Sequence, residues 1–233
     1  MNKPVWALNA RELFKKTRNN ELSATDITVA CLEQIKKVNP QLNAIVDDMS
    51  DDAIERAESL DSAVAAGKPK GRLFGIPVSV KINVDQKGYA TSNGVTALKN
   101  LIAKTNAPIV DHLMDAGAVF VGRTNTPEFS FRADTENPLY GRTNNPWGKH
   151  LSAGGSSGGA SSAVMAGMCT LAHGNDIGGS LRFPSVATGA VTLKPGLGRV
   201  PAWNSSQTSE RGILAQSMSV QGLITRSAYD LQL

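Results

Sequence analysis

Cysteine, histidine and aromatic residues are scarce in this 233-residue sequence, and their scarcity excludes several kinds of protein. There are two cysteines, Cys31 and Cys169, and three histidines, which are scattered along the chain. One pair of distant cysteines does not make a disulfide framework. No CxxC or HxxxH spacing occurs, so the sequence offers no metal site. We therefore expect a chain that works without a metal or an organic cofactor.

Long apolar runs and strong charge are also absent. No run of about 18 apolar residues occurs, and the N-terminus lacks the apolar segment of a signal peptide, so we expect neither a membrane span nor export. The net charge is only +4 without blocks of like charge, which argues against a nucleic-acid-binding protein. With 41% hydrophobic and 19% charged residues, the composition is typical of a soluble globular protein, and we expect it in the cytoplasm.

Glycine, in contrast, is concentrated in one stretch. Eight of the 22 glycines lie in residues 151–184, in two clusters that each stand beside serines and precede a predicted helix. Glycine loses much backbone entropy on folding, so such clusters are ordered only where the backbone needs an unusual conformation. Backbone N–H groups at a helix N-terminus have no intrahelical partner and can bind an anion or oxyanion. We interpret this stretch as the floor of an active site.

Three kinds of site could be formed by this stretch. A phosphate-binding loop would need GxxxxGK[ST], but the stretch contains no lysine. The GxSxG pattern of a nucleophile elbow occurs around Ser156 and Ser157, yet the only later histidine, His173, precedes Asp176 in the wrong order and too closely. A serine nucleophile with a lysine base remains. His173 is the only alternative base, and we expect it to be a buried core residue.

Helices are predicted for most of the first 70 residues. Ser23 and Asp26 form a capping-box pattern, which predicts a helix that ends at Asn39 and Pro40. A second helix is predicted to begin near residue 50 and to end at Gly67, with a short strand at residues 42–46 between the two helices.

Strands and helices alternate after residue 71. The predicted strands are residues 76–84, 118–122, 169–173 and 190–194, and the predicted helices are residues 105–116, 160–168 and 180–187. This alternation indicates an α/β fold with a mixed, largely parallel central sheet that is covered by helices on both faces. The strands at 76–84 and 190–194 are apolar enough to be buried on both faces. Residues 204–211 are polar and are predicted to form a surface loop.

Several segments, taken in order, resemble one family. Residues 154–159 and 174–184 resemble the core of the amidase signature family. Other characteristic segments of this family are similar to residues 75–81, 122–129, 137–147, 193–195, 198–201 and 225–230. The matches run from about Leu22 to the last residue, and their common order identifies the chain as a member of this family.

The resemblance implies a Ser–Ser–Lys triad that hydrolyses a carboxamide. Ser180 would be the nucleophile, Ser156 would follow a cis peptide bond and relay a proton, and Lys81 would be the neutral base. A free lysine has a pKa of about 10.4, and burial lowers it, which suits Lys81 on its apolar strand. The alternative is an ionised Lys81 that pairs with a buried carboxylate.

The resemblance also implies supporting groups and shows three departures from the family pattern. The backbone N–H groups of Ile177, Gly178, Gly179 and Ser180 would form the oxyanion hole, and Ser157, Asp176 and Arg182 would support the site. Ser157 could instead cap a helix, and Ser180 is expected to cap the helix that follows it. The departures are Ile82 in place of an acid, Asn175 in place of threonine or serine, and Ala153 in place of proline. Without an acid beside it, Lys81 would stay neutral more easily, although the departures could equally mark a decaying copy.

We expect residues 1–233 to form one amidase domain, with a helical region at 1–70 and an α/β core at 71–233, that lacks the C-terminal part of the family's fold. An open sheet edge would then be covered by a complementary polypeptide or by a homodimer. The expected function is hydrolysis of a small amide through an acyl-enzyme on Ser180, without nucleic-acid or membrane partners. The alternatives are the glutamine-hydrolysing subunit of a tRNA-dependent amidotransferase, and an incomplete, non-catalytic relative that acts as a binding module.

Overall fold

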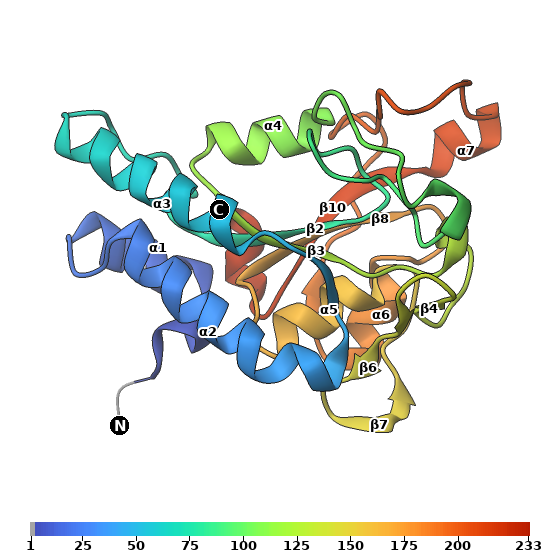
Figure 1. Cartoon of the computed structure of the whole chain (residues 1–233), viewed down its shortest axis with the longest axis horizontal. Helices are drawn as coiled ribbons and strands as arrows, with labels where there is room; N and C mark the ends of the chain where they lie inside the picture. Colours follow the sequence, from blue (N-terminus) through green and yellow to red (C-terminus); the bar gives the residue numbers. More distant parts are fainter. Residues whose placement is uncertain (1–2) are drawn as a thin grey trace.

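A six-stranded mixed sheet forms the centre of the computed structural model, which describes residues 3–233 (Figure 1). Its strands lie in the order β1 (Ile45–Asp48), β3 (Val119–Thr124), β2 (Pro77–Lys81), β8 (Leu171–Asp176), β10 (Val220–Thr225) and β9 (Val191–Thr192). The three central strands β3, β2 and β8 run parallel, whereas β1, β10 and β9 are antiparallel to their neighbours. The predicted mixed α/β fold is confirmed.

Helices lie on both faces of this sheet. The α-helices are α1 (Ala10–Arg18), α2 (Ala24–Leu42), α3 (Ser50–Ala65), α4 (Pro108–Asp115), α5 (Gly158–Met165), α6 (Arg182–Thr188) and α7 (Ile213–Met218). In Figure 1, α4 lies above the sheet, whereas α5 and α6 lie below it. Two small strand pairs, β4 (Glu136–Asn137) with β5 (Gly141–Arg142) and β6 (Asn144–Asn145) with β7 (Gly148–Ser152), lie outside the main sheet.

The core is divided into two apolar clusters by the sheet. Side chains alternate between the two faces of a strand, so neighbours on β3 enter different clusters. Phe120 packs in the cluster that contains Leu113 of α4, whereas Val119 and Val121 pack in the cluster that contains Ala163 of α5. As a result β2 and β3 are buried along their whole length.

Helix α2 begins where the sequence predicts but ends later than predicted. The capping box at Ser23 is confirmed, yet α2 continues through Pro40 to Leu42, so the predicted stop at Asn39 and Pro40 is wrong. Asn39 closes this end with its side-chain oxygen, which accepts the backbone N–H groups of Ala44 and of the next residue at 3.0 Å each. These two bonds give partners to backbone N–H groups that lie just beyond the end of the helix.

The C-terminal strands differ from the prediction. Residues 190–194 contain only the two-residue strand β9, which is half-buried at the sheet edge, so the prediction of a strand buried on both faces is wrong there. Strand β10 was not predicted, because Gln221 and Gly222 interrupt its apolar pattern. A Cβ at Gly222 would lie 2.7 Å from Leu181, so this glycine allows the close approach of the two segments.

The polar loop at residues 204–211 is only partly a surface loop. Asn204 is buried, and its side chain accepts the backbone N–H of Asp85 at 3.0 Å. The Asp85 carboxylate accepts hydrogen bonds from Ser205, Ser206 and Thr91 at 2.6–2.9 Å. The prediction of a surface loop is therefore wrong for residues 204–206, because a buried carboxylate anchors them next to the end of β2.

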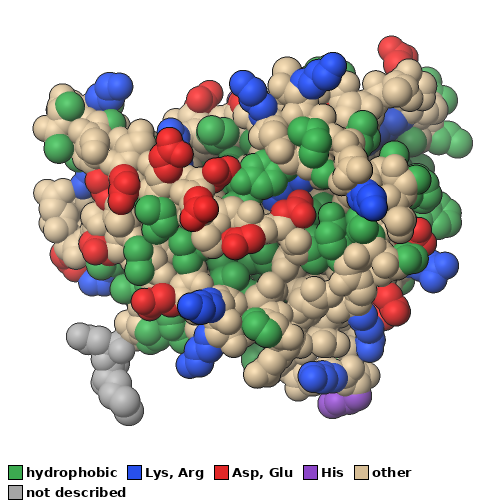
Figure 2. Space-filling model, viewed as in Figure 1, with side chains coloured by type: hydrophobic (Ala, Val, Ile, Leu, Met, Phe, Trp, Pro, Cys, Tyr) green, Lys and Arg blue, Asp and Glu red, His purple; other side chains and the backbone are tan. Residues whose placement is uncertain are grey.

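Two features of the structure bear on binding to membranes and nucleic acid. No helix within residues 3–233 is long and apolar enough to cross a membrane. Figure 2 shows acidic side chains gathered around α3, which contains Asp51, Asp52, Glu55, Glu58 and Asp61. This face would repel the phosphates of nucleic acid. Cys31 and Cys169 are both buried free thiols.

Candidate active site

Lys81 lies at the end of β2 and is completely buried. Its Nζ lies 2.7 Å from Ser156 Oγ, 3.1 Å from Ser157 Oγ and 2.9 Å from Asn175 Oδ1. All three partners are uncharged. The Lys81 ammonium or amine is therefore surrounded by hydroxyl and amide oxygens and is bonded to no carboxylate.

This environment favours a neutral lysine. Burial lowers the pKa of Lys81 to about 7, and the charge of Asp176 partly opposes the shift. No ion pair in the part of the chain that the structure describes includes Lys81, so the alternative of a lysine paired with a buried carboxylate is not what the structure shows. A neutral amine has two N–H groups and one lone pair. These match two acceptors and one hydroxyl donor, which are the groups that Asn175, Ser157 and Ser156 can provide.

A glycine-rich loop presents Ser156 and Ser157 to Lys81. The peptide bond between Gly155 and Ser156 is cis, as predicted. A Cβ at Gly155 would collide with the carbonyl oxygen of Arg132, so only glycine fits at this position. Ser157 stands at the N-cap of α5 without a capping hydrogen bond, and its hydroxyl contacts Lys81 instead. The alternative that Ser157 merely caps the helix is not supported.

Ser180 lies beside this loop through a backbone contact. Its carbonyl accepts the N–H of Ser157 at 3.2 Å, which joins the two glycine clusters of the sequence. The Ser180 hydroxyl makes no hydrogen bond to another residue within 3–233. The segments that carry Lys81, Ser156 and Ser180 thus converge, and the direct contact that the structure contains is between the lysine and the first serine.

Asp176 fixes the backbone around Ser180. Its carboxylate accepts the backbone N–H groups of Gly179 at 2.8 Å and Leu181 at 3.1 Å, and it binds Arg182 Nε at 3.0 Å. Burial acts to raise the pKa of Asp176, but the hydrogen bonds from Arg182, Gly179 and Leu181 outweigh this and lower the pKa. Helix α6 begins at Arg182 after Leu181, so the prediction that Ser180 caps it is wrong, because Asp176 takes the capping role.

The backbone donors predicted for an oxyanion divide into two groups. The N–H of Gly179 is already bonded to Asp176 Oδ1, so this group is not free to bind an oxyanion. The N–H groups of Ile177, Gly178 and Ser180 donate to no protein acceptor in residues 3–233. Three of the four predicted donors are therefore available in this arrangement.

Sequence reasoning missed the amide groups behind Lys81. Asn83 and Asn175 are paired: Asn175 Nδ2 donates to Asn83 Oδ1 at 3.0 Å, and Asn83 Nδ2 donates to Asn175 Oδ1 at 3.2 Å and to Ser130 Oγ at 2.9 Å. Asn175, which departs from the family pattern, thus contacts Lys81 directly. The sequence signal that could have pointed to Asn83 is the polar series Ser79, Lys81 and Asn83. Its spacing of two places the first two side chains on one face of β2.

The remaining residues of interest lie in the core. His173 is buried, its Nε2 lies 2.8 Å from Gln221 Oε1, and burial lowers its pKa to about 4. It bonds to none of the candidate serines 156, 157 and 180 in the described chain, so the structure supports a core histidine rather than a base. Ile82 and Ala153 are also completely buried.

Known proteins resemble this chain in sequence and in fold. The amidase family matches residues 26–233. The chain belongs to the amidase family. An indoleacetamide hydrolase from Bradyrhizobium diazoefficiens is 49% identical over 230 residues, which are 99% of this chain and 44% of that protein. One subunit of the glutamyl-tRNA(Gln) amidotransferase from Rippkaea orientalis is 41% identical over 190 residues, which are 82% of this chain and 39% of that protein.

Solved amidase structures share the same fold. A bacterial aryl acylamidase of the amidase signature family superposes with a TM-score of 0.89 at 30% identity, over 98% of this chain and 47% of that one. The chain therefore spans less than half the length of these relatives.

Proposed function

We propose that this amidase-family chain hydrolyses a carboxamide through an acyl-enzyme on Ser180. The observation that carries the proposal is the 2.7 Å contact between Lys81 Nζ and Ser156 Oγ, in which a completely buried lysine is bonded only to uncharged groups. A lysine with a pKa of about 7 is a base that is half neutral at neutral pH. General bases work best when their pKa is near the operating pH.

In the proposed first half-reaction, protons move from one serine to the next and then to the lysine. The lone pair of Lys81 takes the proton of the Ser156 hydroxyl, and Ser156 Oγ takes the proton of Ser180. Ser180 Oγ then attacks the amide carbon, and the resulting oxyanion accepts hydrogen bonds from Ile177, Gly178 and Ser180 N–H groups. Loss of one such donor commonly costs 10²–10³ in rate. The C–N bond breaks when the proton returns through Ser156 to the leaving nitrogen.

In the second half-reaction water replaces the amine. The same relay removes a proton from water, which attacks the acyl carbon and breaks the ester bond to Ser180. The acid leaves, and Ser180 regains its proton. No atom from a metal or an organic group is needed for either half-reaction.

The relatives guide the choice of substrate. Because the 49% identical relative is an indoleacetamide hydrolase, a primary amide of an arylacetic acid is the first substrate to test. The second candidate is glutamine hydrolysis within a glutamyl-tRNA(Gln) amidotransferase, which the 41% identical relative favours. These functions are distinguished by adding partner subunits, since only the second should require them.

Labelling with a fluorophosphonate tests for an activated serine without knowledge of the substrate. The intact mass of the chain should rise by one phosphonyl group, and the Ser180→Ala variant should remain unlabelled. Ser205→Ala, which changes a serine in the loop bound to Asp85, is a matched control and should label normally. If the folded wild-type chain gains no mass, it is a non-catalytic relative and the proposal is wrong.

We also propose that a second polypeptide or a second copy covers the region around β9. Large apolar side chains are exposed there, with Val186 at 82%, Leu193 at 63% and Leu197 at 60%. Each buried Å² of apolar surface contributes about 25 cal/mol, so covering these side chains would favour association.

A further inference from the structure

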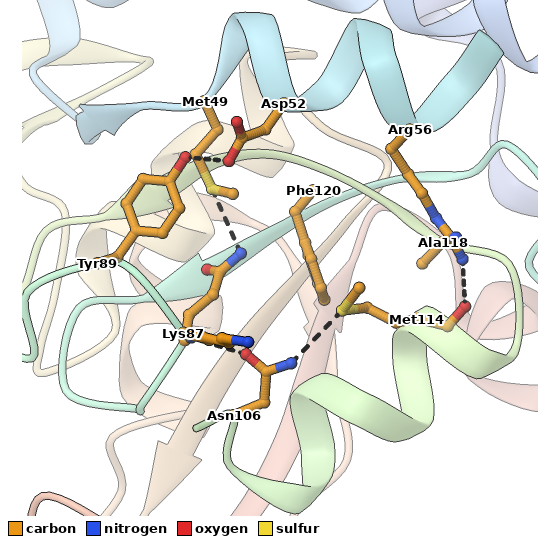
Figure 3. Close-up of a pocket in the computed structure, with 10 residues that line it drawn as sticks. Met49, Asp52, Arg56, Lys87, Tyr89, Asn106, Met114, Ala118 and Phe120 are labelled. Atoms are coloured by element: carbon orange, nitrogen blue, oxygen red, sulfur yellow. Dashed lines mark hydrogen bonds between the residues drawn. The ribbon is translucent and has the colours of Figure 1, made fainter. Parts of the chain in front are cut away.

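One cavity lies away from the candidate active site. It has a volume of about 240 Å³ and is bounded by residues of α3, α4, β3 and the loop after β2 (Figure 3). Its apolar wall includes Met49, Met114, Ala118 and Phe120.

This cavity is on the opposite side of the sheet from Lys81. Met49 and Phe120 belong to the same apolar cluster as Val78 and Val80 of β2. Because side chains alternate along a strand, Lys81 points to the other face, where it meets the N-terminus of α5. A ligand in the cavity would therefore not contact the serines.

Two buried polar atoms at the cavity have no hydrogen-bond partner within residues 3–233. Gln86 is only 5% exposed; its Nε2 contacts Met49 Sδ at 3.6 Å, while its Oε1 has no hydrogen-bond partner. Arg56 donates from one terminal nitrogen to the Met114 carbonyl at 2.8 Å, while its Nε is unpaired. A buried unpaired acceptor is costly, and an O–H or N–H group of a ligand would satisfy it.

The charges at the cavity balance one another. Figure 3 shows the Tyr89 hydroxyl directed at Asp52, to which it donates at 2.5 Å. Asp52 is therefore already engaged, and Lys87 is exposed to solvent. Asp52 and Arg56 lie four positions apart on α3 and carry opposite charges, so with Lys87 in solvent the cavity does not favour a ligand with a net charge.

We propose that this cavity is a binding site for a small, neutral ring compound that carries one O–H or N–H donor. The donor bonds to Gln86 Oε1, and the ring packs against Met49, Met114 and Phe120. The volume suits one ring system, because an apolar cavity of about 150 Å³ already binds benzene in another protein. Methionine sulfur makes favourable contacts with aromatic rings.

Phenol and toluene are matched probes, since they differ mainly in the hydroxyl group. Methionine methyl groups labelled with ¹³C give the readout, because two of the chain's six methionines line the cavity. We expect millimolar phenol to shift the signals of Met49 and Met114 but not those of Met165, Met168 or Met218. Phenol should bind about fivefold more tightly than toluene because of one added hydrogen bond.

The Gln86→Leu variant tests the role of the acceptor. It should fold, since it removes an unpaired buried polar atom, and it should lose the preference for phenol over toluene. Gln34→Leu removes a buried amide elsewhere and should keep that preference. Equal binding of phenol and toluene to the wild-type chain would overturn the proposal, as would phenol that shifts neither Met49 nor Met114. If Gln86→Leu does not fold, the wild-type comparison of the two probes still decides.

Discussion

Lys81 Nζ lies 2.7 Å from the hydroxyl oxygen of Ser156, although the two residues are 75 positions apart in the sequence. Lys81 is completely buried and Ser156 is 1% exposed. Because the other partners of Lys81 are a serine hydroxyl and an amide oxygen, burial rather than an ion pair determines whether the lysine carries a proton.

The pH dependence of serine labelling should follow Lys81. The protonated amine cannot accept a proton, so the labelling rate should rise with pH, with an inflection near the pKa of about 7, and reach a plateau above it. At pH 5 the rate should be about one hundredth of the plateau. Stopped labelling followed by intact-mass measurement gives the profile, and a rate that is constant from pH 5 to pH 9 would contradict a lysine base.

Replacing Lys81 by methionine should slow the labelling of Ser180 strongly while retaining most of the side-chain volume. A general base commonly contributes 10²–10⁴ in rate, so Lys81→Met should label at least about 100-fold more slowly. Lys149→Met changes an exposed lysine and serves as the control, with an unchanged rate. Normal labelling of a folded Lys81→Met chain would remove Lys81 from the mechanism.

Asn175 should control the charge of the lysine. Asn175→Asp would place a carboxylate where an amide oxygen now lies 2.9 Å from Nζ, and an opposite charge at that distance raises the pKa of a lysine. The inflection of the labelling profile should move up by at least about one pH unit. Asn175→Thr keeps an uncharged acceptor and should leave the inflection near that of the wild-type chain. Equal shifts in both variants would show that the effect comes from packing instead.

Asp85 should stabilise the chain through the loop at residues 204–206. Burial acts to raise its pKa, but hydrogen bonds from Ser206, Thr91 and Ser205 outweigh this and lower the pKa. The folded chain therefore binds the proton less readily than the unfolded chain, so the stabilisation is present above about pH 4 and is lost as the pH falls below it.

Asp85→Asn should lower the free energy of unfolding by about 2 kcal/mol at pH 7. Urea unfolding at pH 7 and pH 3.5 measures the difference, which should shrink at the lower pH. Asp134→Asn, at a half-exposed ion pair, is the control and should change the stability little. A difference between wild type and Asp85→Asn that is independent of pH would contradict this account.

Association of the chain should bury the apolar side chains around β9. Sedimentation at micromolar concentration should give a mass above that of one chain. Val186→Asp and Leu193→Asp each place a charge among these exposed residues and should shift the mass toward the monomer. A stable, cooperatively melting wild-type monomer would show that no partner is needed.

The sequence predicted the elements of the fold better than their ends. Local signals succeeded at Ser23, where a capping box begins a helix, whereas the cis peptide bond before Ser156 was expected from the resemblance to a family. They failed at Pro40, because the side chain of Asn39 closes the helix beyond it. Strand β10 was missed because Gln221 and Gly222 interrupt its apolar pattern, and because its partners β8 and β9 are distant in the sequence.

The candidate site was predictable only where a motif carried it. Lys81, Ser156 and the segment of Ser180 were found from the resemblance to a family. Asn83 and the anchor between Asp85 and Asn204 were not, because their contacts join residues separated by 92 and 119 positions and no local pattern specifies such pairs.

The hydrogen bonds between Asp176 and the backbone of the loop before α6 determine which loop positions tolerate substitution. Its carboxylate binds main-chain N–H groups of Gly179 and Leu181, and Gly179 has a φ of 112°, which favours glycine at that position. The side chain of Ile177, which is 42% exposed, takes no part in these bonds. Position 177 is therefore free to vary in size and polarity while the loop keeps its path. This separates the part of the loop that evolution or an engineer can change from the part that must stay fixed.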